Sequence, residues 1–342
     1  MDKRKLVIIG GGFAGTYIAK NLESEFDTTL IDEKDYFEYT PGVLRTIIQP
    51  SSIKKIQSKH KSYLRKTKLI IGEAKEIHRN YVLINNKKLK FDYLVLATGS
   101  GYSKVSGLNI ISTIKAIELK ENFVRLRKAK NVLIIGGGIA GVELAAEIAT
   151  KYKNKKITLI NKDSRLMPRQ NRKASKYAEK FLRKNNVKVL LNQKIMKNYK
   201  NEYITDKGDK IYPDLTFLCL GIQPNSSLME KNFPDKMDNS YIKTNKYMQL
   251  EGFNNIFVAG DVTNIKEEKL AQNAEEHAKV IVENLRNLEN KEKLRKYQTN
   301  HRLMVISLGK YNGIITYKKF TIAGFITSLI KSLIEYWSMK NH

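Results

Sequence analysis

Two glycine-rich stretches have the most specific residue spacing in this sequence of 342 residues. Residues 10–15 are GGGFAG and residues 136–141 are GGGIAG, so each has the spacing G-x-G-x-x-G. Each stretch follows a short apolar run, residues 6–9 or 132–135, and precedes a helical pattern. Such a strand–turn–helix unit presents backbone N–H groups and a helix N-terminus to a pyrophosphate. One copy is weak evidence, because glycine turns also serve packing, but two copies predict two dinucleotide-binding units.

The three glycines of each motif have separate tasks. The first allows a tight turn, the second lets the backbone approach the phosphates, and the third lets the helix pack on the strand. The helical patterns that follow span residues 16–22 and 142–150. The residues expected to contact nucleotide in the two turns are Gly10, Gly12, Phe13, Ala14 and Gly15, and Gly136, Gly138, Ile139, Ala140 and Gly141.

The end of the second strand in each unit indicates which nucleotide that unit accepts. In the first unit this strand ends at Asp32, whose carboxylate can accept hydrogen bonds from both ribose hydroxyls. In the second unit it ends at Asn161, and the basic residues Lys162 and Arg165 follow. A carboxylate would repel a 2′-phosphate, whereas a neutral and basic edge tolerates one. We therefore expect the first unit to bind a cofactor without a 2′-phosphate and the second to accept NADPH as well as NADH. The alternative is that the two basic residues belong only to a general lysine excess.

Two further strand ends surround the second unit. Residues 93–96 form a strand pattern that runs into Ala97, Thr98 and Gly99, and a second pattern at 256–259 runs into Gly260 and Asp261. Glycine permits close backbone approach to a ligand, and a carboxylate can accept hydrogen bonds from a polyhydroxyl chain such as ribitol. Either fragment alone could be an ordinary strand end.

In this order around a second dinucleotide unit, the fragments resemble the two-dinucleotide-binding-domain flavoproteins over nearly the whole chain. The resemblance implies an α/β fold with two Rossmann-like domains, an NAD(P)-binding domain being inserted into a discontinuous FAD-binding domain. It also implies FAD and NAD(P)H as cofactors. We expect residues 1–105 and 226–298 to form the FAD domain, 106–225 the NAD(P) domain, and 299–342 a small C-terminal hairpin-and-helix segment.

The single cysteine, Cys219, limits the chemistry. It excludes an internal disulfide and any relay that needs two thiols in one chain, as in disulfide reductases and sulfide:quinone oxidoreductases. It lies in a buried-strand pattern, where a small apolar filler is the expected role. Direct electron transfer to a quinone, a protein or a small oxidant remains, and we predict no metal site.

The C-terminal region combines a hairpin pattern with an amphipathic one. Residues 301–307 and 314–318 flank a glycine-containing turn, and a helical pattern follows from residue 320. One face of that pattern is polar, with Thr327, Lys331, Glu335 and Ser338. The opposite face suits a membrane interface or a quinone, or alternatively packs on the protein itself or on a dimer mate. It carries Ile322, Phe325, Ile326, Leu329, Ile330, Leu333, Tyr336 and Trp337.

Four segments narrow the resemblance. Residues 37–45, 136–148, 269–285 and 307–314 are similar to the ferroptosis suppressor protein group of apoptosis-inducing-factor-like NAD(P)H:quinone oxidoreductases, close to type II NADH dehydrogenases. The resemblance implies hydride transfer from NAD(P)H to FAD and then two electrons to a quinone, with the C-terminal segment contacting the membrane. One departure is Asp2, because the animal suppressor protein is myristoylated at an N-terminal glycine.

The same resemblance implies roles for individual residues. Glu143, placed by the pattern on the first helical turn, lies near the flavin–nicotinamide junction or only complements the helix dipole. Arg45 and Pro41 approach the flavin, Arg45 being otherwise a surface ion pair. His277 assists quinone protonation or is a packed helix histidine. The other implied positions are Glu147 in the same network as Glu143, Ala74 at the adenine, Gly221 at NAD(P)H, and Lys269 and Gln272 below the flavin.

The net charge of +28 is concentrated in the middle of the chain. Residues 101–200 carry 24 basic and 6 acidic side chains, an excess of 18. This excess can attract a nucleotide or an anionic bilayer, although lysine enrichment from codon composition contributes. Without a base-reading element, nucleic acid is a weaker expectation than a membrane. No secretory segment and no apolar run of about 18 residues is present, so a cytoplasmic, peripherally membrane-associated enzyme is expected. A soluble reductase of a protein acceptor and a non-catalytic, nucleic-acid-binding flavoprotein remain as alternatives.

Overall fold

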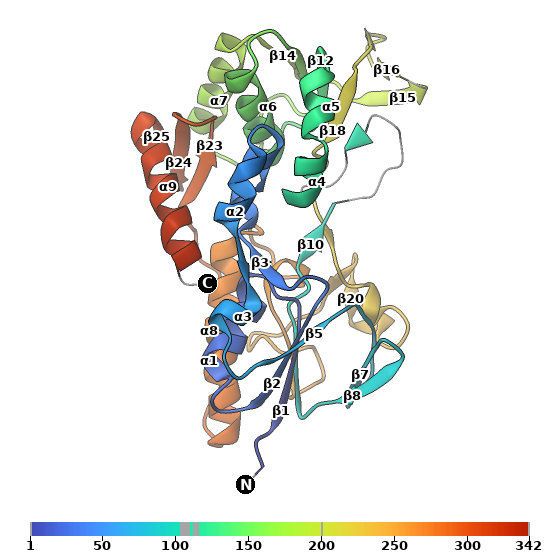
Figure 1. Cartoon of the computed structure of the whole chain (residues 1–342), viewed down its shortest axis with the longest axis vertical. Helices are drawn as coiled ribbons and strands as arrows, with labels where there is room; N and C mark the ends of the chain where they lie inside the picture. The colour runs from blue at the N-terminus through green and yellow to red at the C-terminus, as the bar shows by residue number, and fades with distance from the viewer. Residues whose placement is uncertain (1, 103–109, 112–115, 200, 341–342) are drawn as a thin grey trace.

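The computed structural model describes residues 2–102, 110–111, 116–199 and 201–340. Two parallel sheets occupy opposite ends of the molecule, and a C-terminal segment lies along one side (Figure 1). The α/β prediction with two Rossmann-like sheets is confirmed. The predicted domain boundary between residues 105 and 106 lies outside the described residues.

The first sheet combines strands from both ends of the sequence. Its five parallel strands are, in spatial order, β22 (Ile256–Val258), β9 (Tyr93–Leu96), β1 (Lys5–Ile9), β2 (Asp27–Asp32) and β5 (Lys68–Ile71). Every strand of the second sheet comes from residues between β9 and β22. The chain therefore leaves the first sheet, builds the second, and returns.

Both faces of the first sheet are buried, which explains the uninterrupted apolar run of β1. Leu6 and Ile8 face α1 (Phe13–Leu22) and α8 (Ala271–Glu289), which pack on each other. Val7 and Ile9 face the opposite side, in the apolar cluster of a small antiparallel sheet. That sheet consists of β6 (Ala74–Ile77), β7 (Tyr81–Ile84) and β8 (Lys87–Lys90).

The second sheet repeats this plan. Its parallel strands are β11 (Ile110–Ile111), β18 (Leu215–Leu218), β12 (Asn131–Ile135), β13 (Lys156–Ile160) and β14 (Val187–Leu190). Helices α6 (Ile139–Lys151) and α7 (Arg172–Lys184) cover one face (Figure 1). On the other side lies an antiparallel sheet of β15 (Ile195–Tyr199), β16 (Glu202–Thr205) and β17 (Lys210–Ile211).

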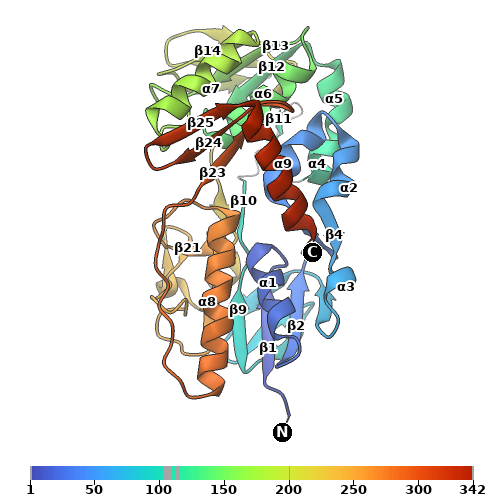
Figure 2. The same cartoon turned by 90° about the vertical axis from the view of Figure 1, so that its left-hand side faces the viewer.

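The C-terminal segment forms a three-stranded antiparallel sheet and a helix. The strands are β23 (Met304–Ser307), β24 (Gly313–Tyr317) and β25 (Phe320–Gly324), and the helix is α9 (Phe325–Lys340). Figure 2 shows this segment beside α7 at one end and extending toward α1 at the other. The prediction that the helix includes Ile322 is wrong, because residues 320–324 pair with β24 as a third strand.

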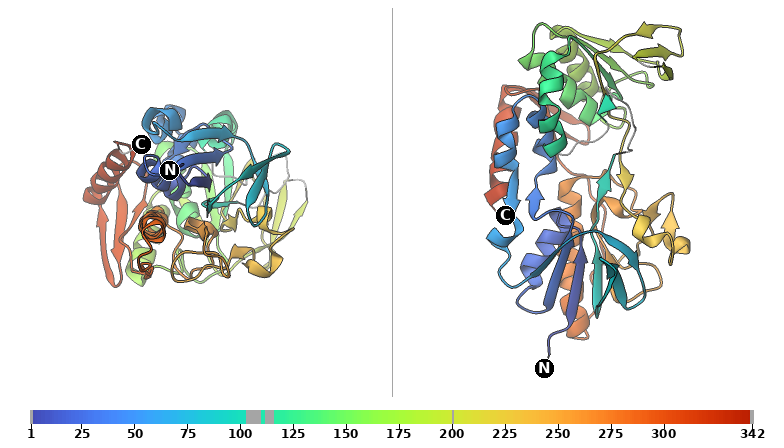
Figure 3. Two further views of the ribbon diagram at one scale, coloured as in Figure 1. Left: turned by 90° about the horizontal axis from the view of Figure 1, so that it is seen from below. Right: turned by 45° about the vertical axis from the view of Figure 1, so that its right-hand side comes forward.

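The two sheets are joined at a short crossing (Figure 3, right). There, β10 (Ser100–Gly101) pairs antiparallel with β19 (Gln223–Pro224). The remaining elements are β3 (Tyr36–Glu38), η1 (Thr40–Ile47), η2 (Pro50–Ser52), α2 (Ile53–Ile56), β4 (Gln57–Lys59), α3 (His60–Tyr63), α4 (Ala116–Glu121), α5 (Phe123–Lys128), η3 (Ser227–Met229), η4 (Pro234–Lys236), β20 (Met237–Asp238), β21 (Tyr241–Ile242) and η5 (Gly260–Val262).

Candidate functional site

The first glycine turn connects β1 to α1 with the geometry that its spacing predicts. Gly10 has φ +103°, and a Cβ there would lie 2.2 Å from the carbonyl oxygen of Ala97. A Cβ at Gly15 would lie 1.8 Å from the carbonyl oxygen of Gly10, so the helix packs directly on the turn. Gly12, the N-cap of α1, has no atom within 4 Å of its ideal Cβ position. The turn is therefore closed toward the sheet and open at the helix N-terminus, where a phosphate would bind.

Asp32 at the end of β2 is fixed beside this turn. Its Oδ2 accepts a hydrogen bond from the Gly11 N–H, and its Oδ1 accepts one of 2.8 Å from the Lys34 N–H. The buried His60 also lies here, since a Cβ at Gly11 would be 2.6 Å from its Nε2. His60 was not predicted from the sequence, because it is distant in the chain and follows no motif.

The second glycine turn repeats the first almost atom for atom. Gly136 has φ +110°, and a Cβ there would lie 2.3 Å from the carbonyl oxygen of Cys219. A Cβ at Gly141 would lie 1.9 Å from the Gly136 carbonyl oxygen, and Gly138 is again open. The Cys219 side chain is buried, and burial raises the pKa of its thiol to about 12. Cys219 therefore acts through its backbone and as a filler, as its strand pattern predicts.

Asn161 occupies the position that Asp32 has in the first unit. Its Oδ1 accepts a 3.1 Å hydrogen bond from the Gly137 N–H, and its Nδ2 donates to the Arg165 carbonyl oxygen at 2.9 Å. The guanidinium of Arg165 donates to the carbonyl oxygens of Gln170, at 2.7 Å, and Pro168. The position equivalent to Asp32 carries an amide in place of a carboxylate, so the geometry is compatible with the expected acceptance of NADPH.

Hydrogen bonds connect the strand ends near the crossing of β10 and β19. Thr98 Oγ1 donates to the Asn225 carbonyl oxygen at 2.6 Å, and Asn225 Nδ2 donates back to the Thr98 carbonyl oxygen at 2.9 Å. Ser100 Oγ donates to Asp261 Oδ2 at 2.7 Å. The other residues that we predict to contact nucleotide lie at the ends of these helices and strands. Phe13 and Ala14 begin α1, Ile139 and Ala140 begin α6, and Ala74 begins β6. Gly99 and Gly221 have positive φ after β9 and β18, and Lys162 is exposed after β13.

His277 and Lys269 contact the backbone of the turn that begins at Gly260 and the residues that follow it. His277 Nδ1 accepts a 3.0 Å hydrogen bond from the Gly260 N–H, and its Nε2 lies 2.8 Å from Glu267 Oε1. Burial acts to raise the pKa of Glu267, but hydrogen bonds from His277 and Tyr297 lower it overall. Burial lowers the pKa of Lys269, whose Nζ donates to the carbonyl oxygens of Thr263 and Ile265 at 2.7 and 3.2 Å. This geometry favours positioning of the turn, and contact of either residue with a quinone stays a prediction.

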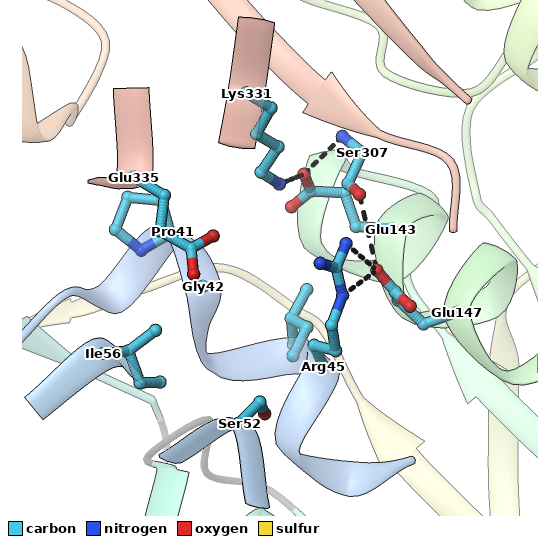
Figure 4. A pocket seen from close by; sticks show the side chains of 11 residues that line it. Pro41, Gly42, Arg45, Ser52, Ile56, Glu143, Glu147, Ser307, Lys331 and Glu335 are labelled. Atoms are coloured by element: carbon cyan, nitrogen blue, oxygen red, sulfur yellow. Dashed lines mark hydrogen bonds and ion pairs between the residues drawn. The ribbon is translucent and has the colours of Figure 1, made fainter. Parts of the chain in front are cut away.

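Four predicted residues, Pro41, Arg45, Glu143 and Glu147, line a small cavity of about 20 Å3 (Figure 4). Arg45 from η1 donates to Glu147 Oε1 from α6, through Nε at 3.3 Å and Nη2 at 3.1 Å. Glu143 Oε1 accepts hydrogen bonds from the Ser307 N–H at 2.7 Å and from Lys331 Nζ at 3.0 Å. The cavity therefore joins both nucleotide units with the C-terminal segment. Its volume is on the scale of one water rather than of an aromatic ring.

The structure corrects the placement of Glu143. Helix α6 begins at Ile139, after the N-cap Gly138, and has no acidic residue in its first turn. Glu143 lies in the second turn, so the Ser307 N–H and the Lys331 ammonium take the place of the helix terminus as its nearest positive partners. Ser307 and Lys331 were missed as site residues. The signal for Lys331 was present, because it is a charged residue on the polar face of an otherwise largely apolar segment.

Helix α9 is oriented with its polar face toward the protein. Thr327 is fully buried, and the side chain of Lys331 is 15% exposed beside Glu143. The eight predicted apolar side chains, seven on α9 and Ile322 on β25, are each between 36% and 67% exposed. The alternative that this apolar face packs on its own protein is therefore wrong.

Comparison with known proteins identifies the family of this chain. Residues 4–278 match the pyridine nucleotide-disulphide oxidoreductase family. The chain belongs to this family. It is 33% identical to "Apoptosis-inducing factor homolog B" of Dictyostelium discoideum over 97% of this chain and 94% of that protein. It is 30% identical to "Ferroptosis suppressor protein 1" of Homo sapiens, over 96% of this chain and 92% of that protein.

Solved structures share the fold of this family member at low identity. The sulfide:quinone oxidoreductase of Aquifex aeolicus has a TM-score of 0.86 at 19% identity, covering 99% of this chain and 92% of that one. NDH2 of Plasmodium falciparum, solved with NADH, has a TM-score of 0.85 at 17% identity, covering 98% of this chain and 96% of that one. The predicted fold class and resemblance are confirmed.

The family establishes the general chemistry. Its members are oxidoreductases that carry FAD and use NAD(P)H, in agreement with the cofactors that the resemblance implies. The family match ends before β23, whereas the ferroptosis suppressor relative is similar through nearly the whole chain. Among the helices in the part of the chain that the structure describes, none combines the length and the hydrophobicity that a membrane span requires.

Proposed function

We propose that this chain is an FAD-dependent NAD(P)H:quinone oxidoreductase that acts at a membrane surface through residues 320–342. The observation that carries the proposal is the orientation of α9. Its outer face exposes seven large apolar side chains, while its inner face brings Lys331 to Glu143 at the cavity between the nucleotide units. An exposed apolar face of this kind is typical of an interfacial helix. One element thus links a lipid-soluble substrate to the redox centre.

The residues of the two turns fit the two nucleotides. We assign FAD to residues 1–105 and 226–298, and NAD(P)H to residues 106–225. Gly12 and Gly138 are open at helix N-termini, where the two pyrophosphates would bind. Asp32 would hold the ribose of FAD, and Asp261 would accept hydrogen bonds from its ribityl chain. When bound, FAD would supply the two-electron chemistry that joins nicotinamide to quinone.

The cavity residues would orient the substrates. Glu147 Oε2 is buried and has no hydrogen-bond partner among the described residues, so it can accept a donor from a ligand. Arg45 is held at Glu147 by a two-point contact, and its side chain is partly exposed. Its charge would stabilise negative charge on a reduced ring system. Glu143 and Lys331 would hold or move a proton at the Oε1–Nζ contact. A quinone as electron acceptor is also supported by the name of one structural neighbour, the sulfide:quinone oxidoreductase of Aquifex aeolicus.

The decisive experiment measures turnover with different acceptors. The purified protein should be yellow and should oxidise NADH and NADPH with a short-chain quinone. The variant Leu329→Glu/Leu333→Glu should lose reduction of a long-chain quinone in vesicles, because it places two charges on the exposed face of α9, while ferricyanide reduction stays unchanged. The matched control is Met196→Glu/Tyr199→Glu, which adds the same charge at exposed apolar residues of β15.

Three results would contradict the proposal. Absence of bound or reconstitutable FAD would remove the redox chemistry. Equal activity of wild type and the Leu329/Leu333 variant on vesicle quinone would show that α9 does not contact the membrane. Turnover that stays intact while the protein does not bind vesicles would favour a soluble reductase of a protein acceptor.

A further inference from the structure

Helix α7, in the second nucleotide unit, carries a dense row of cations. Six of its thirteen residues are basic and one is acidic. At about 100° per residue, the six basic positions fall within about one third of the helix circumference. All six are exposed, while the buried face of α7 packs over the second sheet. The cations are Arg172, Lys173, Lys176, Lys180, Arg183 and Lys184.

Little within the protein neutralises this row. Glu179 pairs with Arg183 at 2.9 Å. The other five cations make no ion pair in the part of the chain that the structure describes. A solvated helix face normally mixes charges of both signs, so a row of one sign calls for an anionic partner.

The row is joined to the apolar C-terminal segment through Asn171. This N-cap residue of α7 accepts a hydrogen bond from the Ala174 N–H at 2.9 Å. Its Nδ2 donates to Thr321 Oγ1 at 2.6 Å and to Thr316 Oγ1 at 2.9 Å, on β25 and β24. Tyr177 adds a 3.0 Å contact with Asn312. These contacts at two points hold α7 beside the C-terminal sheet.

The turn between β24 and β25 extends the same surface. It contains the exposed cations Lys318 and Lys319 between Tyr317, which is 40% exposed, and Phe320, which is 77% exposed. Figure 2 shows α7, β25 and α9 presented on one side of the molecule. Cations therefore adjoin apolar side chains, the combination that favours an anionic lipid interface.

We propose that α7 and the Tyr317–Phe320 turn form an anionic-lipid docking surface, which adds charge selection to the apolar contact of α9. The cations would bind lipid headgroups while the apolar side chains enter the interface. This inference rests on the proposed function, because it requires α9 to contact a membrane. It assigns to the NAD(P)-binding unit a part in membrane docking, and it places that unit against the bilayer.

The test compares vesicles of phosphatidylcholine with and without phosphatidylglycerol, using the full chain with its FAD. We expect wild type to bind the anionic vesicles more tightly and to lose that advantage as salt rises. Lys176→Gln/Lys180→Gln should weaken binding to anionic vesicles about 25-fold, at roughly fivefold per cation. Binding to pure phosphatidylcholine and ferricyanide turnover should not change.

The matched control is Lys87→Gln/Lys90→Gln on β8, which removes the same charge from the opposite side of the molecule (Figure 1). Equal weakening by the two variants, or no preference of wild type for anionic vesicles, would overturn the docking surface and leave the proposed function standing. Wild type that binds neither vesicle would overturn both. A DNA duplex that binds more tightly than anionic vesicles, and loses binding in the α7 variant, would replace lipid by nucleic acid.

Discussion

The two glycine turns have the same backbone and different acceptors. In the first, the Gly11 N–H donates to the carboxylate of Asp32, and in the second the Gly137 N–H donates to the amide oxygen of Asn161 at 3.1 Å. The first glycine of each turn faces a carbonyl oxygen, of Ala97 or Cys219, at nearly equal distance. The fold therefore requires an acceptor at the strand end but does not require a charge there.

This difference separates what the turn needs for folding from what it needs for recognition. The second glycine of each motif, Gly12 or Gly138, is open in both units, so both units can present a helix N-terminus to phosphate. The acceptor differs in charge, so we expect it to distinguish nucleotides by their 2′ substituent. Substitutions at the shared positions test the common frame, and substitutions at the acceptor test selectivity.

The largest expected effect comes from closing one turn at a time with Gly10→Ala or Gly136→Ala. Each Cβ would lie within 2.3 Å of a backbone carbonyl oxygen, at a positive φ that already costs alanine about 1–2 kcal/mol. Gly10→Ala should lose most of its bound FAD. Gly136→Ala should stay yellow and show a KM for NADH raised at least about tenfold. Flavin absorbance per chain and steady-state kinetics measure the two effects.

Gly208→Ala is the matched control, because Gly208 has φ +84° but no atom within 4 Å of its ideal Cβ position. It should show the conformational cost in thermal unfolding and leave both nucleotides bound. Loss of FAD in Gly136→Ala as well as in Gly10→Ala would contradict the assignment of one nucleotide to each turn.

A second, smaller effect is expected from exchanging the acceptors. Asn161→Asp places a carboxylate where a 2′-phosphate would lie, and juxtaposed like charges cost several kcal/mol. The KM for NADPH should rise about tenfold or more relative to that for NADH. Asp32→Asn removes a charged acceptor of the Gly11 N–H and should weaken FAD binding about tenfold. Equal changes for NADH and NADPH in Asn161→Asp would show that this edge does not meet the 2′ position.

The sequence predicted those parts of the structure that depend on local spacing. The two turns, the strands before them and the helices after them follow from glycine geometry and apolar periodicity. The partner of Glu143 could not be predicted, because Ser307 and Lys331 are more than 160 residues away and meet it only after the C-terminal sheet has formed. Amphipathic periodicity defined the two faces of α9, but periodicity carries no information about which face is turned outward.

His277 illustrates the same limit for the predicted site. Its residue type is suited to proton transfer, yet its two nitrogens meet the Gly260 N–H and Glu267. Sequence identifies a histidine on a helix, whereas its task depends on the loop that folds against it.

The smallest expected effect on nucleotide kinetics comes from substitutions of Arg165. Two substitutions there separate the effect of its charge from its effect on loop geometry. Its guanidinium donates to the carbonyl oxygens of Pro168 and Gln170, so it both orders the loop after β13 and contributes positive charge. Arg165→Ala should raise the KM for NADPH about three- to tenfold and that for NADH less, because only NADPH carries the 2′-phosphate. Arg165→Lys keeps the charge and loses the planar fork. NADPH kinetics close to wild type in the lysine variant would assign the effect to charge, whereas kinetics like those of the alanine variant would assign it to the loop. Unchanged NADPH kinetics in Arg165→Ala would remove this residue from nucleotide selection and leave Asn161 as the point at which the two units differ.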